Sequence, residues 1–146
     1  MQGHFTGSIV SLQICPGHRK PMTQVASADM VGNLGLKGDM HAIGDSPRQV
    51  LLIEKETLDA LGLVPGDVKE NITTVGILLM GLPSKTRLRV GTDAIVEITK
   101  PCSPCHRMDE IRPGLLVELA GRRGMLARVV TPGVVHRGDA VTVVDR

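Results

Sequence analysis

Aromatic residues are almost missing from this chain: Phe5 is the only one among 146 residues, and Trp and Tyr are absent. Proteins that hold single-stranded nucleic acids stack the bases on aromatic side chains, and this sequence offers no such platform. The formal net charge of +2, with 22% charged residues, leaves no large basic face for a duplex. We therefore expect no nucleic-acid partner and a core of Val, Ile, Leu, Ala and Met.

Long apolar runs are missing too. No segment reaches the roughly eighteen apolar residues of a membrane span, and the first residues lack the basic and apolar pattern of a secretion signal. We expect a cytoplasmic protein without a membrane partner. In that compartment three cysteines are more typical of free, metal-binding or catalytic thiols than of disulfides. The length fits a single domain, residues 1–146.

Short strands separated by turns dominate the pattern of the chain. Alternating and short apolar runs predict strands at 7–14, 24–28, 49–53, 70–74, 86–90, 94–99, 125–130 and 140–144. Good helix formers predict brief helices at 54–61 and 113–121, and the glycine-rich segment 31–44 predicts a long loop. This balance favours a mainly β fold: a closed or nearly closed β-barrel with two or three short helices.

The segment 100–108, KPCSPCHRM, carries two of the three cysteines. Pro101 and Pro104 fix φ and remove backbone donors, so we expect a loop here. The neighbouring cation Arg107 favours a thiolate, which is the form of cysteine that binds metals and acts as a nucleophile. Cys102 and Cys105 are therefore the candidate catalytic residues.

Four roles remain open for this cysteine pair. A structural zinc site needs a second pair of ligands, which the remaining cysteine and the scattered histidines do not supply. A thioredoxin-like pair needs a βαβ unit, which the pattern lacks. One working thiolate with a less important neighbour is the third role, and two small buried apolar side chains are the fourth.

Two further segments have polar residues suited to a ligand. The segment 38–41 (GDMH) of the glycine-rich loop, with Arg48 at the entrance of a strand, would suit a phosphate group; alternatively Asp39 caps a turn and Arg48 is solvated. Asn71, in the segment 69–74, could bind the edge of a heterocycle such as a pterin, or the segment is a charged edge strand. The basic cluster at 122–128 is typical of a solvated face.

Taken in order, these segments resemble a MOSC domain, the module named for the C-terminal domain of molybdenum cofactor sulfurase. The resemblance extends from about residue 8 to residue 144. It rests on six motifs: GDMH at 38–41, RQVLLI at 48–53, ENIT at 70–73, PCSPCHRM at 101–108, GRRGMLARV at 121–129, and GVV with GD at 133–135 and 138–139.

The resemblance implies a β-barrel that binds the molybdenum cofactor, a pterin with a phosphate and a dithiolene. In related amidoxime-reducing and hydroxylaminopurine-reducing enzymes a loop cysteine ligates molybdenum, and in sulfurases the module receives sulfur. The implied activity is a molybdenum-dependent oxidoreductase for N-hydroxylated compounds or a sulfur transferase, with a redox or sulfur-donor protein as partner. The alternative is a noncatalytic carrier of cofactor or sulfur. No pyridoxal phosphate is expected, because the domain that binds it in sulfurases is missing.

Matching the motifs residue by residue gives the implied site. Cys105 takes the role of metal ligand, Asn71 and Thr73 contact the pterin, and Arg48 lies near the phosphate. Lys69 stands where relatives usually have arginine, which holds phosphate better through two parallel hydrogen bonds. The predicted cofactor-binding set is Asp39, His41, Arg48, Lys69, Asn71, Thr73, Arg107 and Arg128.

Overall fold

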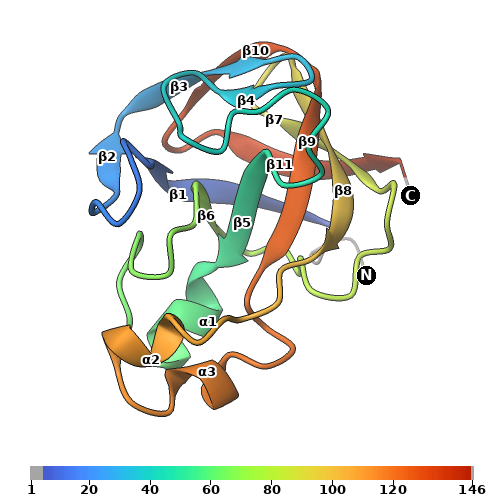
Figure 1. Ribbon diagram of the computed structural model, residues 1–146. Helices are drawn as coiled ribbons and strands as arrows, with labels where there is room; N and C mark the ends of the chain where they lie inside the picture. The colour runs from blue at the N-terminus through green and yellow to red at the C-terminus, as the bar shows by residue number, and fades with distance from the viewer. Residues whose placement is uncertain (1–4, 146) are drawn as a thin grey trace.

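The computed structural model describes residues 5–145, and their strands form a closed barrel (Figure 1). Seven strands of this part follow one another around the barrel in the order β11-β7-β8-β9-β5-β6-β1, and β11 pairs with β1 to close it. Their bounds are β1 (Thr6–Ile14), β5 (Val50–Glu54), β6 (Ile72–Val75), β7 (Arg87–Val90), β8 (Ala94–Pro101), β9 (Met125–Thr131) and β11 (Ala140–Asp145). The predicted mainly β barrel is confirmed.

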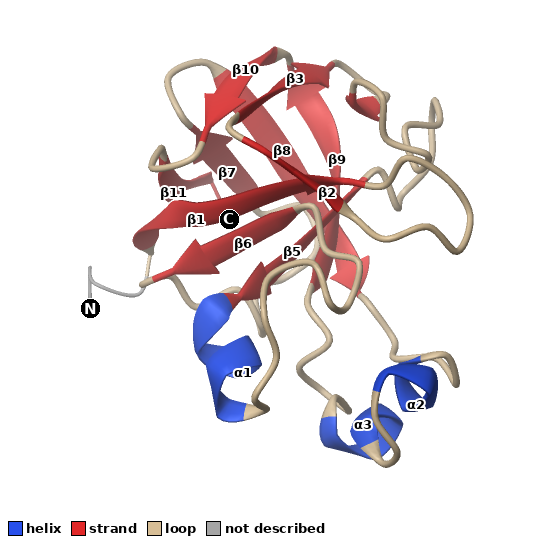
Figure 2. Cartoon of the chain, turned by 90° about the vertical axis from the view of Figure 1, so that its left-hand side faces the viewer, coloured by secondary structure: helices blue, strands red, loops and turns tan. Residues whose placement is uncertain are grey.

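The first and last strands complete the barrel by pairing antiparallel, with Thr6 opposite Thr142. The other neighbours in the barrel are also antiparallel, except for β5 and β6, which are parallel. Parallel neighbours need a crossover connection. Helix α1 (Lys55–Ala60) supplies the first part of it, directly after β5 (Figure 2).

A second, three-stranded sheet lies at the end of the barrel away from the helices (Figure 1). It contains β3 (Ser27–Val31), β4 (Gly35–Leu36) and β10 (Gly133–His136). The strand predicted at 24–28 is divided at Ala26, because β2 (Thr23–Val25) pairs with β1 whereas β3 pairs with β10. The loop predicted at 31–44 contains β4, which is too short to give an alternating pattern.

Aliphatic side chains fill the barrel, as the composition requires. The strands place alternate residues inward, so that Leu12, Leu52, Ile72, Leu88 and Val96 are all buried in one cluster. Complete burial of each such side chain contributes roughly 1.5–3 kcal/mol. This rigid wall holds the loops that surround the site.

A smaller apolar cluster joins the helices to the outside of β5. It includes Ile53, Leu58 of α1, Met108 of α2 (Met108–Ile111) and Leu115 of α3 (Leu115–Glu118). The described part of the chain therefore has three short helices, within the predicted two or three. None of these helices is long and apolar enough to cross a membrane.

Candidate functional site

Two adjoining cavities lie on the outer face of β5, near the helices. The smaller has a volume of about 100 Å³ and the larger about 350 Å³, and both are lined by His41, Lys69 and Arg123. Strand alternation explains their position: Val50 and Leu52 belong to the barrel core, so the intervening Leu51 points outward into the smaller cavity.

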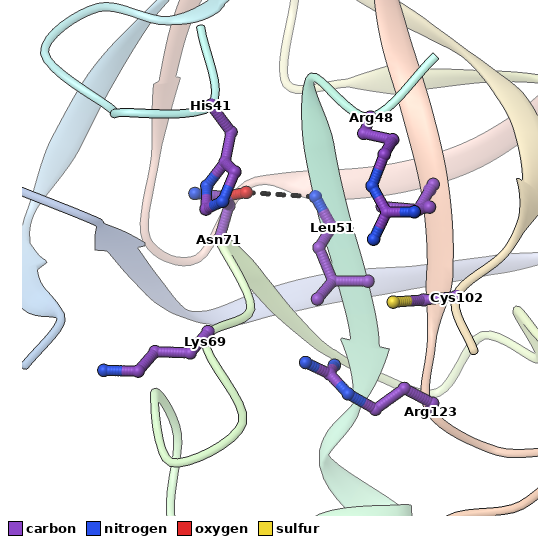
Figure 3. Close-up of a pocket in the computed structure, with 8 residues that line it drawn as sticks. His41, Arg48, Leu51, Lys69, Asn71, Cys102 and Arg123 are labelled. Carbon is purple, nitrogen blue, oxygen red and sulfur yellow. Dashed lines mark hydrogen bonds between the residues drawn. The ribbon is translucent and has the colours of Figure 1, made fainter. Parts of the chain in front are cut away.

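Cys102 lines the smaller cavity. Its backbone N–H donates to the carbonyl of Gly124 at 2.9 Å, which extends the pairing between the ends of β8 and β9. The residue is 7% exposed and packs with Leu51 and Leu126. In Figure 3 the Cys102 sulfur points into the space between the guanidinium groups of Arg48 and Arg123.

Arg123 is the buried cation of the site, with 6% of the residue exposed. One nitrogen, Nη2, donates to the carbonyl of Val68, whereas Nε and Nη1 have no partner among the described residues. Burial lowers the pKa of Arg123, and the nearby Cys102 and Glu70 partly offset this effect. The expectation of a solvated basic cluster is wrong for this residue.

Gly124 explains why Arg123 is drawn inward. Its φ is +106°, and an added Cβ would lie 2.5 Å from the carbonyl oxygen of Leu52. Only glycine permits this approach of the chain to β5, and the approach places the preceding arginine against the strand. The glycine in the sequence motif was a signal for close packing that a charge count does not detect.

The side chain of Asn71 connects β5 to β1 and to the loop that contains Asp39. Its Oδ1 accepts the N–H of Leu51 at 3.0 Å, and its Nδ2 donates to the carbonyl of Gln13 at 3.2 Å and to Asp39 Oδ1 at 3.1 Å. Asn71 also lines the smaller cavity. The edge-strand alternative is wrong, because β6, which follows Asn71, lies between β5 and β1.

Asp39 organises the loop that carries His41. The buried carboxylate accepts the N–H of Cys15 at 2.7 Å and the N–H of His41 at 3.0 Å, and it lies 3.6 Å from His41 Nδ1. These contacts hold the imidazole at the border of the two cavities. Asp39 thus lines neither cavity but holds the loop that carries His41.

Thr73 and Glu70 form a buried pair below the site. Thr73 Oγ1 donates to Glu70 Oε2 at 2.8 Å, and the N–H of Gly66 donates to the same oxygen at 2.9 Å. Burial raises the pKa of Glu70, and these hydrogen bonds partly counter the rise. Glu70 Oε1 has no partner among the described residues.

The larger cavity has cationic and apolar walls around the exposed thiol of Cys105. Arg107 Nη2 lies 3.2 Å from His18 Nε2, and Lys69 Nζ donates to the carbonyl of Lys20 at 2.8 Å. The apolar side chains are those of Met40, Met108 and Ile111, and Cys15 also lines the cavity. Among residues 5–145, no group of three or more His, Cys, Asp or Glu side chains is arranged to hold a metal ion.

Most of the predicted residues meet at these cavities. The smaller is lined by His41, Arg48, Lys69, Asn71 and Cys102, and the larger by His41, Lys69, Cys105 and Arg107. Asp39 and Thr73 lie behind them in the hydrogen-bonded network. Arg128 is elsewhere, where it pairs with Glu97 at 3.1 Å. The predicted set lacks several lining residues, among them Arg123 of both cavities and Cys15 of the larger one.

A closed β-barrel whose outer wall carries thiols beside cationic cavities has the features of a ligand-binding protein. The chain matches the family model described as the MOSC domain over residues 38–142, and it belongs to this family. The family is associated with molybdenum cofactor binding or sulfurase-like function.

Solved structures of low sequence identity share this fold. The YuaD protein from Bacillus subtilis matches with a TM-score of 0.80 at 20% identity, covering 93% of this chain and 94% of that chain. YiiM from Geobacillus stearothermophilus matches with a TM-score of 0.75 at 21% identity, covering 96% of this chain and 76% of that one. YiiM from Escherichia coli gives 0.72 at 19% identity, with 95% and 70% covered. No curated protein matches the chain.

Proposed function

We propose that this protein binds the molybdenum cofactor in the cytoplasm, acts as a single domain over residues 1–146, and uses Cys105 to ligate molybdenum or to carry sulfur to it. One observation carries the proposal: Cys105 is exposed on a cavity of about 350 Å³ whose walls are rich in cations. That volume lies within the range of about 300–1,000 Å³ for small-molecule sites.

The residues present fit such a group. A thiol is a soft ligand that suits a sulfur-bound metal. Arg48, Arg107 and Lys69 would neutralise its phosphate and dithiolene charges, and the two unpartnered nitrogens of Arg123 are further donors for an anion. When bound, the cofactor supplies two-electron redox chemistry, which suits the reduction of N-hydroxylated compounds.

The other predicted residues position these contacts. Asn71 and Asp39 hold β5 and the His41 loop together, and Thr73 anchors the start of β6, so the cavity walls are fixed before a ligand arrives. Contact of Asn71 and Thr73 with a pterin stays a prediction. The assignment of Arg128 to the cofactor also stays a prediction.

A carrier is the second candidate function. The exposure of Cys105 favours it, because a thiol on the surface is accessible to a cysteine of a sulfur-donor protein or to a cofactor-receiving enzyme. In an oxidoreductase the same surface would admit a redox partner. Both roles require Cys105, and they differ in whether the protein alone turns over substrate.

Metal content is the first test. The wild type, Cys105→Ser and Cys102→Ser are produced in a host that makes the cofactor, and molybdenum per chain is measured by mass spectrometry. We expect molybdenum in the wild type and a large loss in Cys105→Ser. A wild type without molybdenum rejects the proposal, and equal loading of Cys105→Ser rejects the ligand role.

Turnover separates the two candidates. Loaded protein is mixed with an N-hydroxylated base and a chemical or enzymatic electron donor, and the reduced base is measured over time. Steady reduction that depends on Cys105 supports the enzyme. Transfer of molybdenum or sulfur to an acceptor enzyme without reduction supports the carrier.

A further inference from the structure

We propose that the smaller cavity is a binding site for a doubly charged tetrahedral oxyanion, with Arg123 at its floor, Arg48 at its rim and the Cys102 thiol beside the anion. This inference deepens the proposed function, because the terminal phosphate of the cofactor is one source of such an anion. Free phosphate or sulfate is the other source. The family resemblance gives Arg123 no role.

Arg123 supplies the first argument. An arginine with only 6% of its surface exposed normally has its donors satisfied, but Nε and Nη1 of Arg123 are unpartnered and Arg123 has no ion pair among the described residues. Glu70 is the carboxyl group that acts on the pKa of Arg123, and burial raises the pKa of Glu70 itself, which favours its neutral form. Nε and Nη1 are each free to donate a hydrogen bond to an oxygen of an anion.

Charge and size supply the second argument. Arg48, Lys69 and Arg123 come from three separate segments and line one space, and none of the described residues that line it is acidic. The volume of about 100 Å³ is equivalent to about three water molecules at roughly 30 Å³ each. That space admits a tetrahedral ion but is well below the roughly 300 Å³ at which sites for organic ligands begin. The organic part of a larger ligand would extend into the adjoining cavity.

Not all three cations contribute equally. Lys69 Nζ donates to the carbonyl of Lys20, and in Figure 3 its side chain points away from Arg123. The guanidinium groups of Arg48 and Arg123 instead lie on either side of the Cys102 sulfur. These two arginines are therefore the contacts that the proposal requires, and Lys69 provides charge at a greater distance.

Binding to the apo-protein tests the site without molybdenum. Protein from a host that cannot make the cofactor is titrated with phosphate, sulfate or chloride at constant ionic strength, and binding is followed by calorimetry and thermal unfolding. We expect phosphate and sulfate, but not chloride, to raise the unfolding temperature by roughly 5–10 °C at a hundredfold excess over Kd. No shift and no binding heat with either dianion overturns the proposal.

Matched arginine variants assign the effect to the site. Arg123→Met should weaken dianion binding by at least about tenfold. The control Arg122→Met should bind the dianion like the wild type, because Arg122 Nε donates a hydrogen bond to the carbonyl of Glu118 at 2.8 Å. Arg48→Met changes an exposed residue, so this variant should fold. If Arg123→Met does not fold, the dianion affinity of Arg48→Met tests the site. Wild-type affinity in both Arg48→Met and folded Arg123→Met overturns the proposal.

Alkylation of Cys102 reports where the anion lies. Phosphate should slow the reaction of Cys102 with the neutral reagent iodoacetamide by about tenfold or more, whereas the exposed Cys105 should react at an unchanged rate. Unchanged reactivity of Cys102 at saturating phosphate places the anion elsewhere and overturns the proposal.

Cofactor-loaded protein distinguishes the two sources of the anion. If the cofactor phosphate occupies the site, Cys102 is protected without added phosphate and free phosphate no longer stabilises the protein. If a free oxyanion occupies it, phosphate still binds to the loaded protein. Dianion binding with no molybdenum uptake would reject the proposed function while retaining this site.

Discussion

Cys102 and Cys105 are three positions apart in the sequence but line different cavities: Cys102 is buried in the smaller one, and Cys105 is exposed on the larger one. The segment between them leaves the end of β8, and its Pro104 has no backbone N–H to donate to a strand pairing. The two thiols therefore have different surroundings, and we expect them to differ in reactivity.

Alkylation rates should separate the two thiols in ligand-free protein. Cys105 should react with iodoacetamide faster than Cys102 by about tenfold or more, because access limits the reaction of a buried thiol. Peptide mass spectrometry at successive times measures both rates in one sample. Faster modification of Cys102 would contradict the arrangement of the two cavities.

Asn71→Ala should lower the free energy of unfolding by about 2–4 kcal/mol, because the N–H of Leu51, the carbonyl of Gln13 and Asp39 Oδ1 all lose a partner. Urea unfolding measures the change. Asn71→Asp is the informative companion: it retains an acceptor for Leu51 but sets a carboxylate beside Asp39, so it should be less stable at neutral than at acidic pH. A loss below about 0.5 kcal/mol for Asn71→Ala would contradict the structural role.

Gly124→Ala should destabilise the protein by at least about 2 kcal/mol, because strain at positive φ adds to a Cβ contact at 2.5 Å with the carbonyl of Leu52. Gly81→Ala is the matched control: its φ is +93°, but its Cβ would meet no atom within 4 Å. The difference between the two unfolding free energies isolates the steric part. Equal losses would show that β5 and the start of β9 are not in close contact.

Glu70 should make stability depend on pH. Burial raises the pKa of its carboxyl in the folded protein above the ordinary value of 4.5. Its stabilising contribution is therefore complete below pH 4.5 and is lost as the pH rises through the higher folded-state pKa. Glu70→Gln, which stays neutral, should lack this loss.

The measurement is the unfolding free energy of both proteins in urea from pH 4 to 8. The unfolding free energy of Glu70→Gln relative to that of the wild type should increase as the pH rises. A constant difference over this range would contradict a raised pKa of Glu70.

The sequence predicts the barrel because its strands have a local signature. Leu12 and Ile14 on β1, and Leu88 and Val90 on β7, alternate with residues of the other face, and that pattern depends only on neighbours in the chain. Helix α2 was not predicted, because its four residues are too few to establish a helical period. The division of the strand at 24–28 depends on pairing with β1 and β10, which no local pattern contains.

The site was predicted only in part, because local sequence contains residue types but not long-range contacts. Residue types identified the thiols and most of the cations, but burial and partners come from distant segments. Arg123 is buried by contact with Val68 and by the approach of Gly124 to Leu52, so its charge alone indicated a solvated residue. The hydrogen bonds of Asn71 likewise reach residues far away in the sequence, and from sequence alone only its chemistry could be considered.

X-ray absorption at the molybdenum edge of loaded protein tests the central claim most directly, because it counts the sulfur atoms bound to the metal. The wild type and Cys102→Ser should have equal sulfur coordination, and loaded Cys105→Ser should have one sulfur fewer. Sulfur coordination that is unchanged in Cys105→Ser, or that falls in Cys102→Ser instead, would contradict the assignment of Cys105 as the ligand.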